Sequence, residues 1–180
     1  LALESAVISD KIDKISDRIV SYSEKYFKVT VLALCSKMMN LELGPRDINE
    51  IIDANIMRDI KFLSNEYINE ILILRDSKLY FGIRSSIVAK YLLQKTSSAE
   101  IIIEVLYKTA QYAVKYSQNK RYANILRYII SFSLISTFID KFPKKEIFME
   151  KYYEKLSMLP YFSTNHFFWL QYSMACIEIA

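Results

Sequence analysis

The chain has 180 residues, of which 52% are hydrophobic and 24% are charged, and its formal net charge is +4. This composition is typical of a globular chain and excludes an intrinsically disordered one. Only two glycines and three prolines occur, so sharp turns are few and long helices are expected.

The first expected element is a connecting helix over residues 1–22. Its isoleucines at 8, 12, 15 and 19 are spaced by four, three and four residues, which places them in one stripe along a helix. Two interpretations stay open: a connecting or coiled-coil helix that docks on a separate surface, or an ordinary first helix that packs on its own domain. Because the sequence starts at Leu1 without a signal-peptide pattern, we expect it to be a piece of a longer protein.

Three helices are predicted over residues 24–70. Residues 24–40 are apolar on most of the helix circumference and predict a buried central helix. Gly44 and Pro45 mark a break and the start of the second helix, because proline is tolerated at the first helical position. The third helix is expected over residues 57–70, and its predicted apolar face consists of Ile60, Leu63 and Tyr67.

A change of pattern at residues 71–83 predicts a short β-hairpin. Two apolar runs of strand-forming residues lie on either side of the polar residues 75–78. Three helices followed by a two-stranded hairpin make a winged helix. We therefore assign residues 23–95 to a winged-helix domain.

Residues 96–180 predict consecutive antiparallel helices, the pattern of a tetratricopeptide-like helical-hairpin array. Ser97 and Glu100 have the spacing of a capping box that begins a helix ending near Tyr116. Further helices are expected near residues 120–140, 144–158 and 164–180. The fold class is therefore expected to be mainly α.

The two cysteines and one apolar stretch bear on the cellular location. Cys35 and Cys176 lie in apolar helical contexts, so we expect buried thiols in a reduced, cytoplasmic protein. The apolar stretch 125–139 includes Arg127 and three serines, and it is shorter than the roughly 18–20 apolar residues that a membrane span needs. A buried core helix is expected there, and no membrane partner.

The residue types exclude several kinds of active site. The chain has no G-x-x-x-x-G-K-[ST] pattern, so this segment has no P-loop for a nucleotide. A zinc site needs about four ligands, and the only soft ligands are Cys35, Cys176 and His166. His166 is the sole histidine and lies at an expected helix start beside three aromatic residues. We therefore expect no catalytic residue, cofactor or metal, and a segment that is not an enzyme.

Positive charge is concentrated over residues 108–155, where ten Lys and Arg residues stand against four acidic ones. Such a surface suits an acidic protein or nucleic acid, although a solvated helix face also accounts for it. The candidate interaction residues on this surface are Lys115, Lys120, Arg121, Lys144, Lys145 and Lys151.

The expected third helix raises the alternative of DNA binding, since this helix of a winged helix commonly enters the major groove. Its candidate DNA-contacting residues are Arg58, Lys61 and Asn65. Acidic residues lie among them, so the helix face is nearly neutral and is poorly suited to binding phosphates. A protein-docking or regulatory role is therefore favoured over nucleic acid.

Residues 80–93, YFGIRSSIVAKYLL, resemble the winged-helix region that follows the ATPase core of bacterial STAND-type P-loop NTPases, many of which look like antiviral defence proteins. Arg84 and Ala89 agree with the family pattern, whereas Ser85 and Lys90 stand in place of its histidine and acidic residue. That histidine senses the nucleotide phosphate in related proteins, so the resemblance does not extend to direct nucleotide sensing.

The end of the chain carries a second resemblance. Trp169, Tyr172, Ser173 and Ala175 resemble the first helix of a tetratricopeptide-type repeat. Residues 164–180 are therefore expected to be the first half of a helical hairpin. Part of this helix should stay unpaired, which makes self-association through it possible, and its predicted packing stripe is Trp169, Tyr172 and Cys176.

Together the two resemblances cover about residues 24–95 and 161–180 and imply a non-catalytic regulatory segment of a larger STAND-type NTPase. The winged helix would relay the nucleotide state of an ATPase core to a helical sensor array, with Arg84 at the hinge. The expected partners are other domains of the parent protein and a further protein. The alternatives are a winged-helix transcription regulator with a helical dimerisation domain, and a purely structural scaffold.

Overall fold

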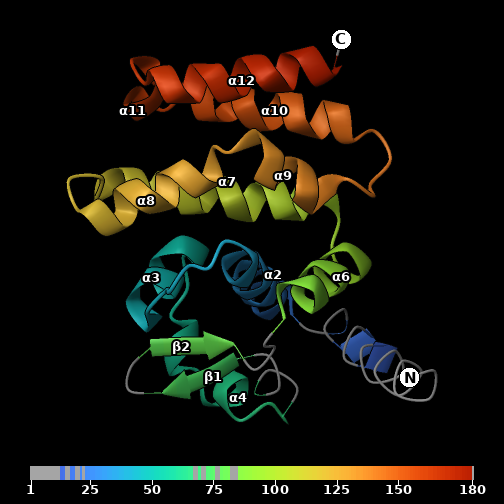
Figure 1. The fold of residues 1–180 in the computed structure, drawn as a ribbon. Coiled ribbons are helices and arrows are strands. Elements are labelled where there is room, and N and C mark those ends of the chain that lie inside the picture. Colours follow the sequence, from blue (N-terminus) through green and yellow to red (C-terminus); the bar gives the residue numbers. More distant parts are fainter. Residues whose placement is uncertain are drawn as a thin grey trace. The chain divides into compact units, whose positions relative to one another are not determined.

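The structure is a computed structural model, and it describes residues 13–14, 17–18, 21, 23–66, 69, 72–75, 78–81 and 85–179. These residues are mainly helical, which confirms the expected fold class (Figure 1). The chain divides into two compact units, Leu1–Ser97 and Ser98–Ala180. Each unit has its own buried residues and is described by itself.

The core helix of the first unit is α2 (Glu24–Met38). Eight consecutive residues of this helix, from Val29 to Ser36, are buried, so it is covered on all sides along two turns. The prediction of a central helix is therefore confirmed. Helix α6 (Ser86–Thr96) lies beside α2 and contributes Ala89, Leu92 and Leu93 to the same core.

Helix α3 (Pro45–Ile52) begins where the sequence predicts. Pro45 occupies the first turn, and the Asp47 carboxylate accepts a hydrogen bond from the Gly44 amide at 2.8 Å. This bond satisfies an amide that the helix itself leaves without a partner. The helix then buries Ile48, Ile51 and Ile52 against the core.

The third predicted helix is interrupted. The described residues form a 3₁₀ turn, η1 (Ile56–Arg58), and the single-turn helix α4 (Ile60–Leu63), with Asp59 extended between them. Helical backbone recurs at Glu66 and Asn69, where the Asn69 amide donates to the Asn65 carbonyl at 3.0 Å. Phe62 is buried and its ring centroid lies 5.0 Å from that of Tyr26. Ile60 is 80% exposed. The predicted apolar face is therefore wrong at Ile60, because Phe62 is the residue that packs inward, while Leu63 is half-buried. Tyr67 lies outside the described residues.

Two short strands follow, β1 (Leu72–Arg75) and β2 (Lys78–Phe81). Their backbones pair antiparallel, with Leu72 opposite Phe81 and Arg75 opposite Lys78. The predicted hinge residue Arg84 lies outside the described residues, as does most of the connecting helix predicted over residues 1–22.

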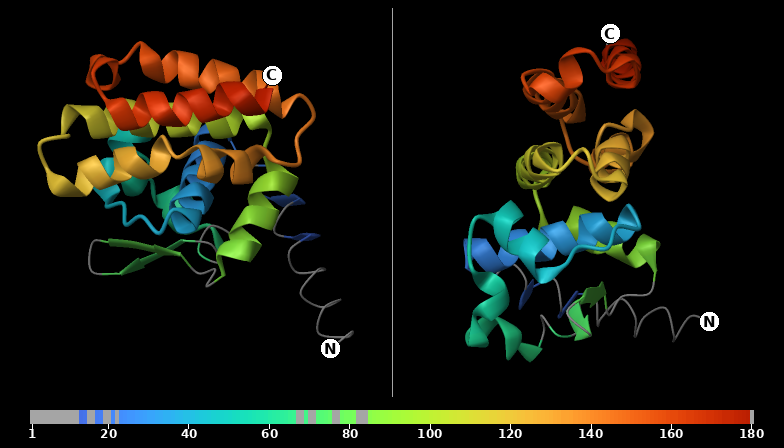
Figure 2. Two further views of the ribbon diagram at one scale, coloured as in Figure 1. Left: turned by 45° about the horizontal axis from the view of Figure 1, so that its top comes forward. Right: turned by 90° about the vertical axis from the view of Figure 1, so that its left-hand side faces the viewer.

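The second unit contains successive helices that run back and forth. They are α7 (Ala99–Lys115), α8 (Lys120–Ile129), α9 (Phe132–Ile139), α10 (Lys145–Ser157), α11 (Pro160–Ser163) and α12 (His166–Ile179). Helices α7 and α8 lie side by side, and so do α10 and α12 (Figures 1 and 2). The cap of α7 is Ser98, whose Oγ accepts from the Ile101 amide, so the capping box predicted at Ser97 is wrong by one residue.

The single helix predicted near residues 120–140 is broken at Ile130–Ser131, and α8 and α9 are bent by 57° there. Neighbouring helices satisfy the backbone groups at this break. The hydroxyls of Tyr152 and Tyr153 donate to the carbonyls of Ile129 and Ile130 at 2.9 and 2.8 Å. The Phe132 amide donates to Gln171 Oε1 at 2.8 Å. Side chains from α10 and α12 thus supply the hydrogen bonds that the backbone loses where the helix is broken.

Within the part of the chain that the structure describes, no helix taken singly has the length and apolar content of a membrane span. Only when α8 and α9 are counted together, across the bend between them, do the described helices reach the length and apolar composition of a membrane span.

Candidate interaction surface

The six candidate basic residues of the second unit do not form one patch. Lys115 ends α7, and Lys120 and Arg121 begin α8, whereas Lys144 and Lys145 lie where α10 begins. The α7–α8 turn and the α9–α10 connection are at opposite ends of this unit (Figures 1 and 2). Lys151 lies on α10 between these ends. The structure therefore separates the predicted surface into an α8 part and an α10 part.

The candidate DNA-contacting residues are also separated. Arg58 belongs to η1 and Lys61 to α4, while Asn65 follows α4. The Asp59 carboxylate lies between them and accepts from the Tyr26 hydroxyl at 2.6 Å and from the Lys61 amide at 2.9 Å. The Tyr26 hydrogen bond lowers the pKa of Asp59. A carboxylate held in its charged form thus interrupts the basic face expected for a recognition helix.

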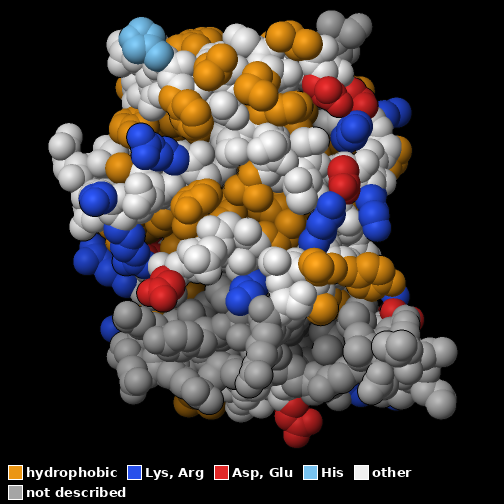
Figure 3. Space-filling model, in the orientation of Figure 1, with side chains coloured by type: hydrophobic (Ala, Val, Ile, Leu, Met, Phe, Trp, Pro, Cys, Tyr) orange, Lys and Arg blue, Asp and Glu red, His pale blue; other side chains and the backbone are white. Residues whose placement is uncertain are grey.

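The α8 part is the more uniformly positive of the two. Residues 105–139 contain five Lys and Arg residues and no Asp or Glu. Helix α8 buries Ile125, Leu126 and Ile129, so its cations remain on the opposite face, where Lys and Arg side chains gather in Figure 3. This face presents positive charge with no carboxylate on the same helix to offset it.

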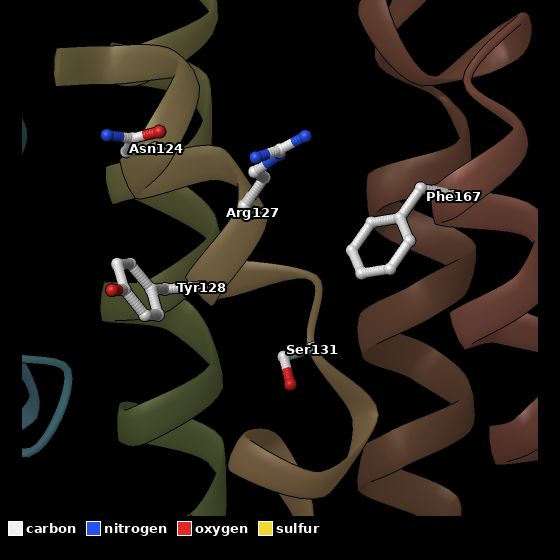
Figure 4. A pocket seen from close by; sticks show the side chains of 5 residues that line it. All are labelled: Asn124, Arg127, Tyr128, Ser131 and Phe167. Carbon is white, nitrogen blue, oxygen red and sulfur yellow. The ribbon is translucent and has the colours of Figure 1, made fainter. Parts of the chain in front are cut away.

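A groove lies between α8 and the start of α12. Its larger lobe has a volume of about 610 Å³ and is lined by Asn124, Arg127, Tyr128, Ser131 and Phe167 (Figure 4). An adjoining lobe of about 430 Å³ shares three of these residues, Asn124, Arg127 and Phe167, and extends toward Lys120 and Tyr161. The two lobes therefore form one groove, named here the α8–α12 groove.

Phe167 is placed by the local structure at the start of α12. The Asn165 side chain accepts from the Phe168 amide at 3.0 Å and so caps the helix. Phe168 is buried, with its ring centroid 4.9 Å from that of Phe162. Trp169 Nε1 donates to the Ser163 carbonyl at 3.0 Å, which fastens α11 to α12. Phe167 is left 45% exposed, and its ring reaches toward the α8–α9 break (Figure 4).

The groove combines hydrogen-bond donors with aromatic surface. The Arg127 guanidinium, the Asn124 amide and the Ser131 hydroxyl all donate, and a guanidinium matches the planar geometry of a carboxylate. Phe167 and Tyr128 offer apolar contact area beside these donors. A carboxylate next to an apolar side chain is the ligand chemistry that this arrangement fits.

Large apolar side chains are exposed along α12. Phe167, Leu170, Met174 and Ile177 are 45, 57, 41 and 78% exposed, and the face they form is called the α12 seam. The opposite side of the helix carries Phe168, Gln171 and Ala175, which are buried.

The packing stripe predicted for this helix is therefore right at Tyr172 and wrong at its other two residues. Tyr172 is half-buried and stacks on Tyr153 with ring centroids 5.3 Å apart, but Trp169 and Cys176 are exposed. The stripe is displaced because Phe168 and Ala175, one position before each, turn toward α10. Cys35 is buried as predicted, whereas the prediction of a buried Cys176 is wrong.

The sole histidine, His166, is exposed and begins α12. Among the described residues no three His, Cys, Asp or Glu side chains are grouped so that they could hold a metal ion. None of the five residues that line the larger lobe, Asn124, Arg127, Tyr128, Ser131 and Phe167, was a predicted interaction residue. The run of residues 105–139 without a carboxylate was a signal for the first four. No signal in the sequence marked Phe167.

Searches of the chain against protein-family models, curated proteins and solved structures find no match. The geometry of the site therefore carries the functional argument.

Proposed function

We propose that this chain is a non-catalytic regulatory and protein-interaction segment of a larger STAND-type NTPase, and that its α8–α12 groove binds an acidic segment of a protein partner. The observation that carries the proposal is the groove itself. Arg127 and Phe167 line it together, and Arg127 belongs to residues 105–139, a stretch of chain with five cations and no carboxylate. Such a surface attracts an acidic segment at long range and accommodates an apolar side chain at contact.

The first unit is assigned the relay role. The order of its elements, helices followed by the antiparallel pair β1–β2 and then α6, fits a winged helix with β1–β2 as the wing. The helix pairs of the second unit fit the beginning of a tetratricopeptide-like sensor array. In this proposal the winged helix moves as a rigid body when an ATPase core changes its nucleotide state, and the array carries the partner site.

DNA binding is the less favoured function because of the Asp59 carboxylate. Neutralising phosphates with Lys and Arg supplies much of the affinity for DNA. Arg58 and Lys61 are too few for this, and the charged carboxylate between them repels the same phosphates.

The test is a titration of the chain against a fluorescein-labelled peptide of about ten residues that contains several glutamates and one central phenylalanine. We expect binding in the micromolar range, as for a small transient interface, that weakens as salt is added. The matched control peptide carries glutamine in place of every glutamate and should bind at least about tenfold more weakly, a difference of roughly 1.4 kcal/mol.

Equal binding of both peptides would overturn the assignment of the groove to acidic partners. Tighter binding of a DNA duplex than of the peptide, abolished by Arg58→Glu with Lys61→Glu, would favour the transcription-regulator alternative.

A further inference from the structure

We infer that the partner on the α12 seam is a second copy of this chain, whose α12 packs antiparallel against the first and places Glu178 in the α8–α12 groove. This inference rests on the proposed function, because it names one carboxylate that the groove accepts.

The seam has the repeat of a two-helix interface. Phe167, Leu170, Met174 and Ile177 follow one another at three, four and three residues, which are the a and d positions of a heptad. All four side chains are more than 40% exposed. A helix that buries one apolar side on its own unit and exposes a second one lacks a partner for that second side.

The seam is complementary to itself when two copies run in opposite directions. A two-fold axis near Tyr172 places Phe167 opposite Ile177, and it places Leu170 opposite Met174, so that each large side chain meets a different one. Parallel pairing would instead set Phe167 against Phe167 and Ile177 against Ile177. The antiparallel arrangement also opposes the two helix dipoles, which favours it further.

Charge supports the same arrangement. Glu178 is the only Asp, Glu, Lys or Arg on α12. It lies on the side of the seam that faces α9, where it lines a depression with Phe132 and Ser136, bordered also by Lys145, Glu146 and Met149. Arg127 lies on this same side, beside Phe167 at the other end of the helix.

In an antiparallel pair, equivalent flanks of the two helices face each other. Glu178 of one copy therefore reaches the level of His166 and Phe167 on the second copy, on the flank that carries Arg127. The carboxylate meets a guanidinium, and the neighbouring Ile177 meets the Phe167 ring. The two-fold axis repeats this contact at the other end, so one interface contains it twice.

The interface is small. Helix α12 has 14 residues and is about 21 Å long, and four side chains from each copy fall short of the standard interface area of about 1,600 Å². The dimer is therefore expected to be transient, with association that rises with protein concentration.

The test is sedimentation velocity of the full chain at increasing protein concentration. We expect the weight-average mass to rise toward twice the monomer mass. Leu170→Glu should hold the chain monomeric over the same range, while its helical circular dichroism stays unchanged because the position is exposed. The matched control is Met158→Glu, which changes a side chain that is 76% exposed and lies off the seam, and it should leave the association unaltered.

Two further variants test the orientation of the pair. Arg127→Glu and Glu178→Arg should each weaken association about tenfold or more, and the double variant should regain most of it. In a Cys176→Ser background, a short bismaleimide should cross-link Ser173→Cys of one copy to Ser173→Cys of the other. Position 173 borders the seam, and the two copies of this position face each other only when the helices are antiparallel.

A chain that stays monomeric at all concentrations would overturn the inference, and the seam would then have to be covered by a segment other than a second α12. Dimerisation that Leu170→Glu does not affect, or failure of the charge exchange to restore association, would overturn the proposed geometry. The acidic peptide distinguishes failure of the dimer from failure of the proposed function. If only the dimer is wrong, the peptide still binds to monomeric Leu170→Glu. If the proposed function is wrong, the peptide does not bind at all.

Discussion

At the scale of single residues, Tyr26 and Asp59 join α2 to the turn before α4. The hydroxyl of Tyr26 donates to the carboxylate at 2.6 Å, and this bond lowers the pKa of Asp59 in the folded protein. A carboxyl with a lowered folded-state pKa adds stability above its ordinary pKa of about 4, and this stability is lost as the pH falls through the folded value.

Tyr26→Phe should therefore lower the urea midpoint of unfolding at pH 6, and the difference from wild type should shrink as the pH falls below about 4. Urea unfolding at several pH values measures this gap. Tyr91→Phe, at a 43% exposed position, serves as the control and should show no such pH dependence. A gap that is constant down to pH 2 would show that the hydrogen bond does not act through the charge of Asp59.

The two thiols should differ sharply in reactivity. Burial raises the pKa of the Cys35 thiol, and the thiolate is the reactive form, whereas Cys176 is exposed. Ellman's reagent should modify one thiol per native chain rapidly and the second only on unfolding. Cys176→Ser should remove the rapid phase, and two thiols reacting at one rate would contradict the position of Cys35.

At the scale of elements, the groove lies beside the break between α8 and α9, where Arg127 near the end of α8 and Ser131 at the break line it together with Phe167. The carbonyls exposed by the break are bound by buried hydroxyls of α10. Tyr152→Phe and Tyr153→Phe should each lower the free energy of unfolding by about 1–3 kcal/mol, since each leaves a buried carbonyl without its partner. Chemical denaturation measures the loss.

Tyr107→Phe is the matched control for these variants, because Lys155 lies over the Tyr107 ring and a phenylalanine keeps that ring. Its effect should stay within about 0.5 kcal/mol. Losses that small for both Tyr152→Phe and Tyr153→Phe would show that the break does not depend on these hydroxyls.

The elements that the sequence predicted well are those with local causes. The run of apolar residues over 24–40 predicted α2, and Pro45 predicted the start of α3. The break in 120–140 was missed because no glycine or proline marks it, and its hydrogen-bond partners lie 23 and 39 residues further along the chain. The face of α4 was missed because one turn of helix has too few residues to show a periodicity.

At the scale of the whole molecule, the sequence was enough to predict a mainly helical chain of two units, but it was not enough to predict the groove. Positive charge over 108–155 was visible, yet only the fold divides it between the two ends of the second unit. Phe167 lies 40 residues after Arg127, and it joins the groove only because Asn165 starts α12 beside the broken helix.

The central claim is that the α8–α12 groove is the partner site, and the most direct measurement is the titration of the glutamate-rich, phenylalanine-containing peptide against two charge variants. Arg127→Glu should weaken binding at least about tenfold, more than its long-range charge effect alone. Lys151→Glu makes the same change in net charge on α10 and should weaken binding only slightly at 150 mM salt. Equal losses in both variants would contradict the claim, because binding would then follow overall charge and not the groove.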